Sequence, residues 1–198
     1  MKQESCLTDQ RPLGRRRLVS LVGLALASLL VLAACSKGAQ STGGDTALPA
    51  DFQISAYQGE NHLGSDEVNL SELLAQGKPV VLNMWAGLCP PCRLEMPDLQ
   101  AVHHAFQDQI ILVGLDVGPF TALGTRDDGR ALLQELGITY PAGTTFDAEV
   151  VRAYQLTGMP STFFIKPNGE ITRKWTGLLT EAKLTELVED LLKASEGS

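Results

Sequence analysis

Two short apolar runs in the middle of the chain predict buried strands. Residues 80–85 (VVLNMW) and 110–116 (IILVGLD) are almost wholly apolar, and continuous runs of this length are typical of strands that are covered on both faces of a sheet. Between them, four apolar residues recur near helical spacing: Leu94, Leu99, Val102 and Phe106. This spacing predicts a helix over residues 91–107, interrupted by Pro97 because a proline removes one backbone donor.

Helix and strand patterns continue through the second half of the chain. Residues 126–136 predict a helix, and residues 147–156 predict a shorter one. Two strand-like runs follow at 162–165 and 171–175, and the dipeptide Asn168-Gly169 lies between them. An Asn-Gly pair flanked by such runs is typical of a β-hairpin.

The chain closes with residues 180–192, in which the leucines and one valine recur at a period of 3.6 residues. This period predicts an amphipathic helix that lies on the sheet. The order strand, helix, strand, helix, hairpin and helix indicates an α/β fold over residues 51–198, with parallel and antiparallel strands in a central mixed sheet flanked by helices.

Residues 1–34 have the pattern of a secretory signal. Arginines at 11 and 15–17 precede an apolar run, 18–32, which is followed by small residues and Cys35. A basic start, an apolar run and small residues before a cleavage point are typical of exported proteins. The run is short for a membrane span of about 20 residues, although an uncleaved anchor remains an alternative. Its end, Leu-Ala-Ala-Cys, resembles a bacterial lipobox, which implies a lipid on Cys35.

Composition and charge narrow the possible partners. Residues 35–50 are rich in Gly, Ser, Thr and Ala without an apolar period, which predicts a flexible tether. The net charge is −7, and no basic stretch follows residue 17, so the pattern expected of a nucleic-acid-binding protein is missing. An acidic chain is not attracted to an anionic bilayer, and we therefore expect membrane attachment through the lipid alone.

The four cysteines divide into two groups. Cys6 lies in the segment that export would remove and Cys35 in the lipobox, which leaves Cys89 and Cys92 in the folded part as a Cys-x-x-Cys motif. With no other cysteine to pair with, a disulfide framework is excluded. An inert disulfide between the two is a weak alternative, because so short a loop removes little chain entropy.

A metal site is the other use of a Cys-x-x-Cys motif. Structural zinc requires four ligands, and the three histidines of the chain, His62, His103 and His104, do not form a second ligand pair. We expect His103 and His104 at the outer end of their helix, without a role. The sequence therefore predicts no metal and no cofactor, and it favours redox chemistry at the cysteine pair.

Several separated motifs resemble the thioredoxin-fold thiol-disulfide oxidoreductases of the TlpA/ResA/CcmG (DsbE-like) family. They are the segment VVLNMWA before Cys89, Pro97 in the following helix, residues 157–165 (TGMPSTFFI), Asn168-Gly169 and Gly177. The resemblance covers roughly residues 50–193. It implies a thioredoxin fold in which the strand at residues 80–85 leads into the cysteine motif at the start of a helix.

This placement gives the two cysteines different roles. At a helix N-terminus, free N–H groups and the helix dipole stabilise a thiolate, so we predict that Cys89 is the nucleophile and Cys92 the resolving thiol. The resemblance further implies a cis peptide bond before Pro160, with Pro160 facing the disulfide and shielding it from metals. The backbone of Met159 would then contact an incoming peptide.

Three further residues are candidates around the cysteines. Glu95 is either a buried carboxylate that takes a proton from Cys92 or a solvated charge near Arg93 or Lys78. Trp85 is predicted to pack beside the active-site turn and contact substrate, although burial in the core explains it equally well. Leu88 stands where the family usually has tryptophan, so we expect a less aromatic substrate surface there.

The resemblance implies an extracytoplasmic, lipid-anchored, monomeric enzyme that reduces protein disulfides, including those of apocytochrome c. Its electrons would come from a membrane protein of the DsbD/CcdA kind. A disulfide-forming oxidase of the same fold is the alternative, because the two differ only in reduction potential. A Sco-type copper chaperone is a weaker alternative, because that class spaces its cysteines by three residues and adds a distal histidine, and this chain has neither feature. A peroxiredoxin is disfavoured, because it would need a Pro-x-x-x-Thr/Ser segment before its cysteine, which this chain lacks.

Overall fold

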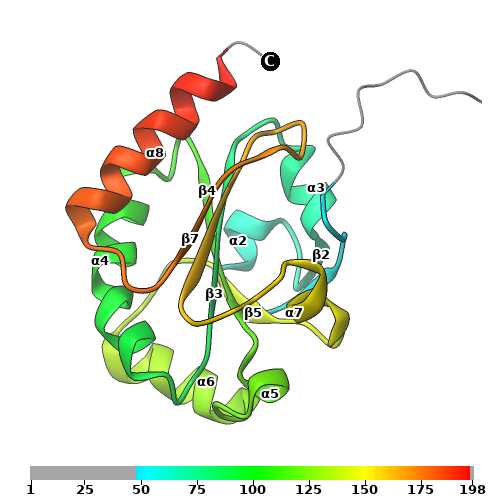
Figure 1. The fold of residues 1–198 in the computed structure, drawn as a ribbon, viewed down its shortest axis with the longest axis vertical. Coiled ribbons are helices and arrows are strands. Elements are labelled where there is room, and N and C mark those ends of the chain that lie inside the picture. Colours follow the sequence, from blue (N-terminus) through cyan, green and yellow to red (C-terminus); the bar gives the residue numbers. More distant parts are fainter. Residues whose placement is uncertain (1–47, 197–198) are drawn as a thin grey trace, which may run out of the picture. The chain divides into compact units, whose positions relative to one another are not determined.

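A seven-stranded mixed sheet forms the centre of the computed structural model, which describes residues 48–196 (Figure 1). Its strand order is β2-β1-β5-β4-β3-β6-β7. In chain order the strands are β1 (Gln53–Gln58), β2 (Glu67–Asn69), β3 (Val80–Trp85), β4 (Ile111–Asp116), β5 (Ala142–Thr144), β6 (Ser161–Ile165) and β7 (Ile171–Thr176). Every residue of β3 and β4 is buried, as expected for central strands with helices on both sides.

Strand direction brings the ends of several strands to one edge of the sheet. β3 is parallel to β4, and β4 is parallel to β5, whereas β6 runs antiparallel to β3. The carboxyl ends of β3, β4 and β5 and the beginning of β6 therefore share one edge. The remaining pairs, β1 with β2, β1 with β5 and β6 with β7, are antiparallel, which confirms the predicted mixed sheet.

Helices cover both faces of the sheet (Figure 1). They are α2 (Glu60–Leu63), α3 (Leu70–Leu74), α4 (Pro90–Phe106), α5 (Gly118–Thr121), α6 (Arg126–Leu136), α7 (Glu149–Ala153) and α8 (Glu181–Ser195). Leucines of α4, α6 and α8 share one hydrophobic core, and apolar residues of α2, α3 and α7 share the core on the other face. Two separate cores on the two faces of one sheet are the arrangement expected of an α/β sandwich.

The elements with long apolar patterns agree with the sequence-based predictions. The predicted helix at 126–136 matches α6, and the predicted strand at 80–85 matches β3. The helix expected at 147–156 is shorter, because α7 covers only Glu149–Ala153. The N-terminal strands and the three-residue strand β5 were not predicted, since β5 consists of Ala-Gly-Thr and is held by pairing with β1 and β4.

Helix α4 buries Leu99 and Val102 of the predicted apolar stripe, but not Leu94. Leu94 is 68% exposed, whereas Cys92, Glu95, Met96 and Leu99 face the core. His103 is also buried, at 5% exposure, so its predicted position at the outer end of the helix is wrong. Burial accounts for the lowered pKa of His103, about 4, with His62 and His104 as further causes.

The predicted signal peptide at 1–34, the lipidation site Cys35 and most of the predicted tether at 35–50 lie outside the described residues. Across residues 48–196, no helix combines the length and the apolar character needed to span a membrane.

Candidate active site

Cys89 lies where strand β3 passes into helix α4. The strand ends at Trp85, a three-residue turn follows, and Cys89 is the N-cap residue of α4. Pro90 and Pro91 occupy the first helical positions, where a missing N–H costs little because these donors have no partner within the helix. The sequence thus places the first cysteine at the positive end of a 17-residue helix.

Cys89 and Cys92 form a disulfide bond, with their Cα atoms 5.3 Å apart. The Cys89 Sγ also accepts a hydrogen bond from the Cys92 backbone N–H at 3.3 Å. In the reduced protein the same N–H and the helix dipole would stabilise a Cys89 thiolate. Cys89 is 4% exposed and Cys92 1%, so an incoming sulfur meets Cys89 more readily than Cys92.

Pro160 lies at the same edge of the sheet, directly before β6. The Met159–Pro160 peptide bond is cis, as the resemblance implies. The Pro160 carbonyl accepts a hydrogen bond from the Gly177 N–H at 2.8 Å, which ties this segment to the end of β7. Met159 is half-buried and packs against the core that contains both cysteines. These contacts leave part of Met159 open to solvent.

Glu95 is fully buried one turn after Cys92, so the surface-charge interpretation of this residue is wrong. Its Oε1 accepts a hydrogen bond from the Asn83 side chain at 2.8 Å, and its Oε2 accepts one from the Leu179 N–H at 3.0 Å. Burial raises the pKa of Glu95 to about 7, although both hydrogen bonds act in the opposite direction. A carboxyl group with this pKa can exchange a proton near neutral pH.

Asn83 and Thr162 complete the polar network, and sequence reasoning assigned neither a role in it. The Asn83 amide also donates to the Thr162 hydroxyl at 3.0 Å. Asn83 of β3 and Thr162 of β6 are direct partners in neighbouring strands, and both side chains point to the face of the sheet that α4 covers. Asn83 inside the apolar run VVLNMW is the sequence signal for this network, whereas Thr162 at the start of β6 gives no such signal.

The remaining two candidates differ in exposure. Leu88 is 60% exposed and stands directly before Cys89, where it is open to a partner. Trp85 has no exposed surface and packs in the core beneath the cysteines. Trp85 therefore has no surface with which to contact a substrate. Its position in the core instead supports the active-site turn from below.

Asp116 is a buried carboxyl group that sequence reasoning missed. It ends β4, opposite Trp85, and accepts hydrogen bonds from the Tyr57 hydroxyl at 3.0 Å and the Gly118 N–H at 2.9 Å. Burial raises its pKa. The Val117 N–H donates to the Trp85 carbonyl at 2.9 Å, so the Asp116 segment is attached to the strand that carries the cysteine motif.

The three histidines gather at the other end of α4. The ring centroids of His62 and His103 are 5.4 Å apart, and those of His103 and His104 are 5.8 Å apart. No group of three or more His, Cys, Asp or Glu side chains within residues 48–196 is arranged to hold a metal ion.

A mixed sheet of the thioredoxin type with a Cys-x-x-Cys disulfide at a helix N-terminus defines a thiol-disulfide oxidoreductase. The sequence model of the AhpC/TSA family matches residues 46–174. Thiol-disulfide oxidoreductase ResA of Oceanobacillus iheyensis is 35% identical over 144 residues, which are 71% of this chain and 69% of the relative. The chain therefore belongs to the AhpC/TSA family, among its ResA-like and DsbE-like thiol-disulfide oxidoreductases.

A second relative agrees with this assignment, and a solved structure shares the fold. Thiol:disulfide interchange protein DsbE of Escherichia coli K12 is 30% identical over 176 residues, which cover 88% of this chain and 90% of the relative. A solved structure from Chlorobium tepidum, also described as a DsbE thiol:disulfide interchange protein, shares the fold with a TM-score of 0.60 and 22% identity, covering 73% of this chain and 95% of that chain.

Proposed function

We propose that this enzyme reduces disulfide bonds of other proteins on the outer side of a bacterial cell membrane. The observation that carries the proposal is the Cys89–Cys92 disulfide at the start of α4, with the buried Glu95 carboxyl one turn further along. This arrangement combines an activated sulfur, a second sulfur within bonding distance and a group that can accept a proton.

The reaction consists of two sulfur exchanges. In the reduced enzyme the Cys89 thiolate attacks one sulfur of the substrate disulfide, which forms a mixed disulfide and releases the other substrate sulfur as a thiolate. The Cys92 thiol then loses its proton and attacks the Cys89 sulfur. This step forms the Cys89–Cys92 disulfide and releases the second substrate thiolate. Two electrons pass from the enzyme to the substrate.

Glu95 is proposed to accept the proton that Cys92 loses. Cys92 and Glu95 are three residues apart on α4 and both face the core, which places the two side chains on one side of the helix. A carboxylate in this apolar setting is a stronger base than one in water, because burial raises its pKa. The hydrogen bonds from Asn83 and Leu179 keep the carboxyl group in position.

The proposed location of the enzyme is supported by the sequence of its first 35 residues. The basic start, the apolar run and the Leu-Ala-Ala-Cys end favour export and a lipid anchor at Cys35. We further propose a DsbD/CcdA-like membrane protein as electron donor and apocytochrome c as one substrate, with the enzyme acting as a monomer. The similarity to ResA and DsbE supports protein disulfides as the class of substrate.

The direction of electron flow is tested by the reduction potential. We expect a value near the roughly −270 mV of thioredoxin, as a reductant requires, and far from the roughly −120 mV of the oxidant DsbA. Equilibration of the purified residues 48–198 with glutathione and dithiothreitol redox buffers measures it. The same protein should reduce insulin disulfides in the presence of dithiothreitol. A potential close to that of DsbA would show an oxidase instead.

Substitution of Pro160 by threonine tests the proposed role of the segment before β6. We expect Pro160→Thr to fold with a melting temperature close to that of the parent protein, yet to accumulate mixed disulfides or bind zinc, because the ring that shields the sulfurs is lost. Non-reducing electrophoresis and zinc titration of the reduced protein measure both effects. Pro167→Thr, in the β6–β7 turn, is the control. Unaltered turnover and no zinc binding in Pro160→Thr would contradict this role.

A further inference from the structure

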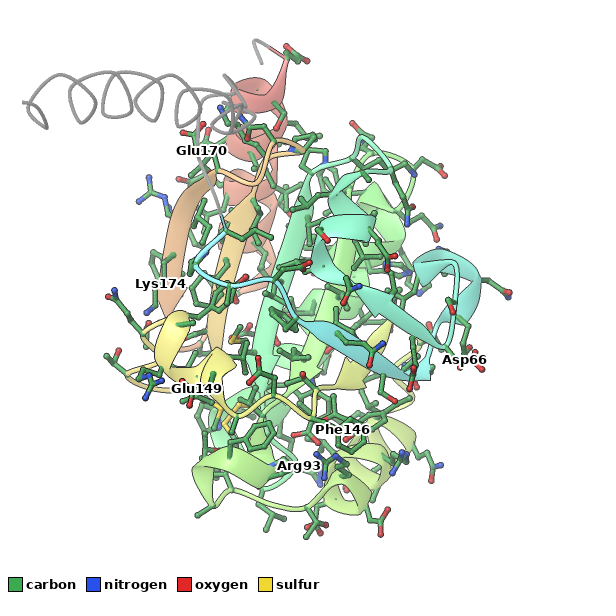
Figure 2. The ribbon with its side chains drawn as sticks, turned by 90° about the vertical axis from the view of Figure 1, so that its right-hand side faces the viewer. Asp66, Arg93, Phe146, Glu149, Glu170 and Lys174 are labelled. Atoms are coloured by element: carbon green, nitrogen blue, oxygen red, sulfur yellow. A yellow bond between two sulfur atoms is a disulfide. The ribbon has the colours of Figure 1, made fainter. Side chains whose placement is uncertain are left out.

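Asp116 lies at the edge of the sheet that carries the active site. It is the last residue of β4, which runs parallel to β3. The start of α4 and the segment after β5 belong to the same edge. Figure 2 shows Arg93 and Phe146, which mark these two segments, at one end of the molecule and Glu170 of the β6–β7 turn at the other. Asp116 has no exposed surface, and the two sulfur exchanges leave this buried carboxyl group without a role.

One carboxyl oxygen of Asp116 fixes the loop that precedes α6. The Oδ1 atom accepts a hydrogen bond from the Gly118 N–H at 2.9 Å, at the start of α5. The carbonyl of the same glycine accepts the Leu123 N–H at 3.2 Å, and the Leu123 carbonyl accepts the Leu88 N–H at 2.8 Å. A continuous set of contacts therefore runs from the carboxyl group to the residue directly before Cys89.

The other carboxyl oxygen supports helix α6. The Oδ2 atom of Asp116 accepts a hydrogen bond from the Tyr57 hydroxyl at 3.0 Å. The same oxygen lies so close to Gly129 of α6 that a Cβ on this glycine would be 2.3 Å from it. Helix α6 in turn touches the active-site turn, because a Cβ on Gly87 would lie 2.6 Å from the Gly129 backbone nitrogen. This second set of contacts ends on the residue before Leu88.

The carboxyl group is itself held firmly in place. The Thr144 hydroxyl donates to the Asp116 carbonyl at 2.9 Å. The guanidinium of Arg130 lies over the Tyr57 ring, 4.3 Å from its centroid, and a cation in this position is attracted to the ring face. Both carboxyl oxygens have donors, as a buried polar group requires. Asp116 is thus a fixed point against which the loop and the helix are placed.

We propose that Asp116 is a positioning residue for Cys89, because its two oxygens fix the loop and the helix that together hold residues 87 and 88 of the active-site turn. The inference rests on the proposed function, in which the Cys89 thiolate makes the first attack. The N-terminus of α4 stabilises this thiolate only over a short range and in the right orientation. A turn that has lost its support therefore leaves the sulfur less often ionised.

Asp116→Ala removes both oxygens, and we expect it to raise the pKa of the Cys89 thiol by about one unit, because part of the stabilisation by the helix N-terminus is lost. The thiolate is then about tenfold less abundant at a pH below this pKa. Alkylation of the reduced full chain by iodoacetamide over a pH series measures the thiol pKa. Every protein in the series also carries Cys92→Ser, so that mass spectrometry of the peptide with the motif reports on Cys89 alone.

Asp116→Asn separates position from charge. Its amide oxygen can still accept the Gly118 N–H, and its amide nitrogen can donate to the Tyr57 hydroxyl. We therefore expect this variant to restore the thiol pKa of the parent. A charge that acts directly on the thiolate predicts a different pattern, in which both substitutions lower the thiol pKa alike, because a neighbouring negative charge disfavours ionisation. That pattern would overturn the positioning role.

Tyr57→Phe tests the same support if Asp116→Ala does not fold. It removes one hydrogen bond to the carboxyl group and should raise the thiol pKa by a smaller amount. Tyr154→Phe is the matched control, since this tyrosine donates to the Ala50 carbonyl at 2.8 Å within the core of the other face. Both tyrosine substitutions should lower the melting temperature, but only Tyr57→Phe should change the thiol pKa.

A parent value of the thiol pKa in both Asp116→Ala and Tyr57→Phe would overturn the inference. If only Tyr57→Phe folds, its parent value alone would do so. Alkylation needs no substrate protein, so this result would leave the proposed function standing. A reduction potential of the parent enzyme close to that of DsbA would overturn the proposed function and leave the positioning role of Asp116 intact.

Discussion

Replacement of Cys92 by serine is expected to stop the enzyme after the first sulfur exchange and leave the substrate bound to Cys89. The Cys89 sulfur keeps its place at the N-terminus of α4, so the attack on a substrate disulfide proceeds. A serine hydroxyl does not displace the substrate from the mixed disulfide, because it is not ionised near neutral pH. Turnover should fall to the rate without enzyme. Non-reducing electrophoresis and intact mass measurement should find a covalent adduct that dithiothreitol releases.

Cys89→Ser is the matched control for this experiment. The nucleophile is then absent, and Cys92 is almost wholly buried at 1% exposure, so neither turnover nor an adduct is expected. If Cys92→Ser retained turnover, or if Cys89→Ser formed the adduct instead, the assignment of nucleophile and resolving thiol would be wrong. Recovering the adduct from cells would also identify the physiological substrate.

Glu95→Gln is expected to slow the second exchange and remove its dependence on pH near neutrality. In the parent protein the carboxylate form of Glu95 accepts the Cys92 proton, and the pKa of Glu95 is about 7. The rate of the second exchange should therefore rise as the pH passes upward through 7. General base catalysis contributes about 10²-fold or more, so a loss of this size is expected in the variant. Rapid-quench measurement of mixed-disulfide decay between pH 5.5 and 8.5 gives the rate of the second exchange and its dependence on pH.

The same substitution should change how stability depends on pH. The pKa of Glu95 is raised above its value of 4.5 in the unfolded chain, so the folded state favours the protonated form. The contribution of Glu95 to the free energy of unfolding is then greatest below pH 4.5. This contribution is lost as the pH rises through about 7. The decline is on the order of 3 kcal/mol. Glu95→Gln should lack this decline when urea unfolding is measured at each pH.

A surface glutamate provides the control for both Glu95 measurements. Glu189→Gln changes an exposed residue of α8 and should leave the rate profile and the stability profile unaltered. If Glu95→Gln kept the parent rate profile, Glu95 would be a structural residue only. If it kept the parent stability profile, its carboxyl group would not be protonated preferentially in the folded state.

Much of the active site could be predicted because it is local in the chain. Strand β3, the turn, the N-cap cysteine, the two prolines and helix α4 follow one another within residues 80–106. The apolar run and the prolines specify this strand-to-helix passage with few contacts from elsewhere. The position of Cys89 at the positive end of a helix is thus encoded by neighbouring residues, and so is the spacing that lets Cys92 reach it.

The properties of Glu95, His103 and Asp116 were decided by the tertiary structure. The sequence left Glu95 equally suited to solvent and core, and its burial depends on donors from Asn83 and Leu179, the second of which is 84 residues away. His103 is buried because α2 brings His62 against it. Asp116 is buried because Tyr57, from a strand that was not predicted, donates a hydrogen bond across 59 residues.

By itself, then, the sequence determined the fold class and the redox motif, since these depend on periodicity and on neighbours along the chain. Only the tertiary structure decided which polar groups are desolvated, which raises the pKa of Glu95 toward neutrality. It also decided that α6 would lie against the active-site turn, where a Cβ on Gly87 would be 2.5 Å from the Asp128 backbone carbon. Desolvation and such close contacts depend on segments that are distant in the chain, and no local pattern specifies them.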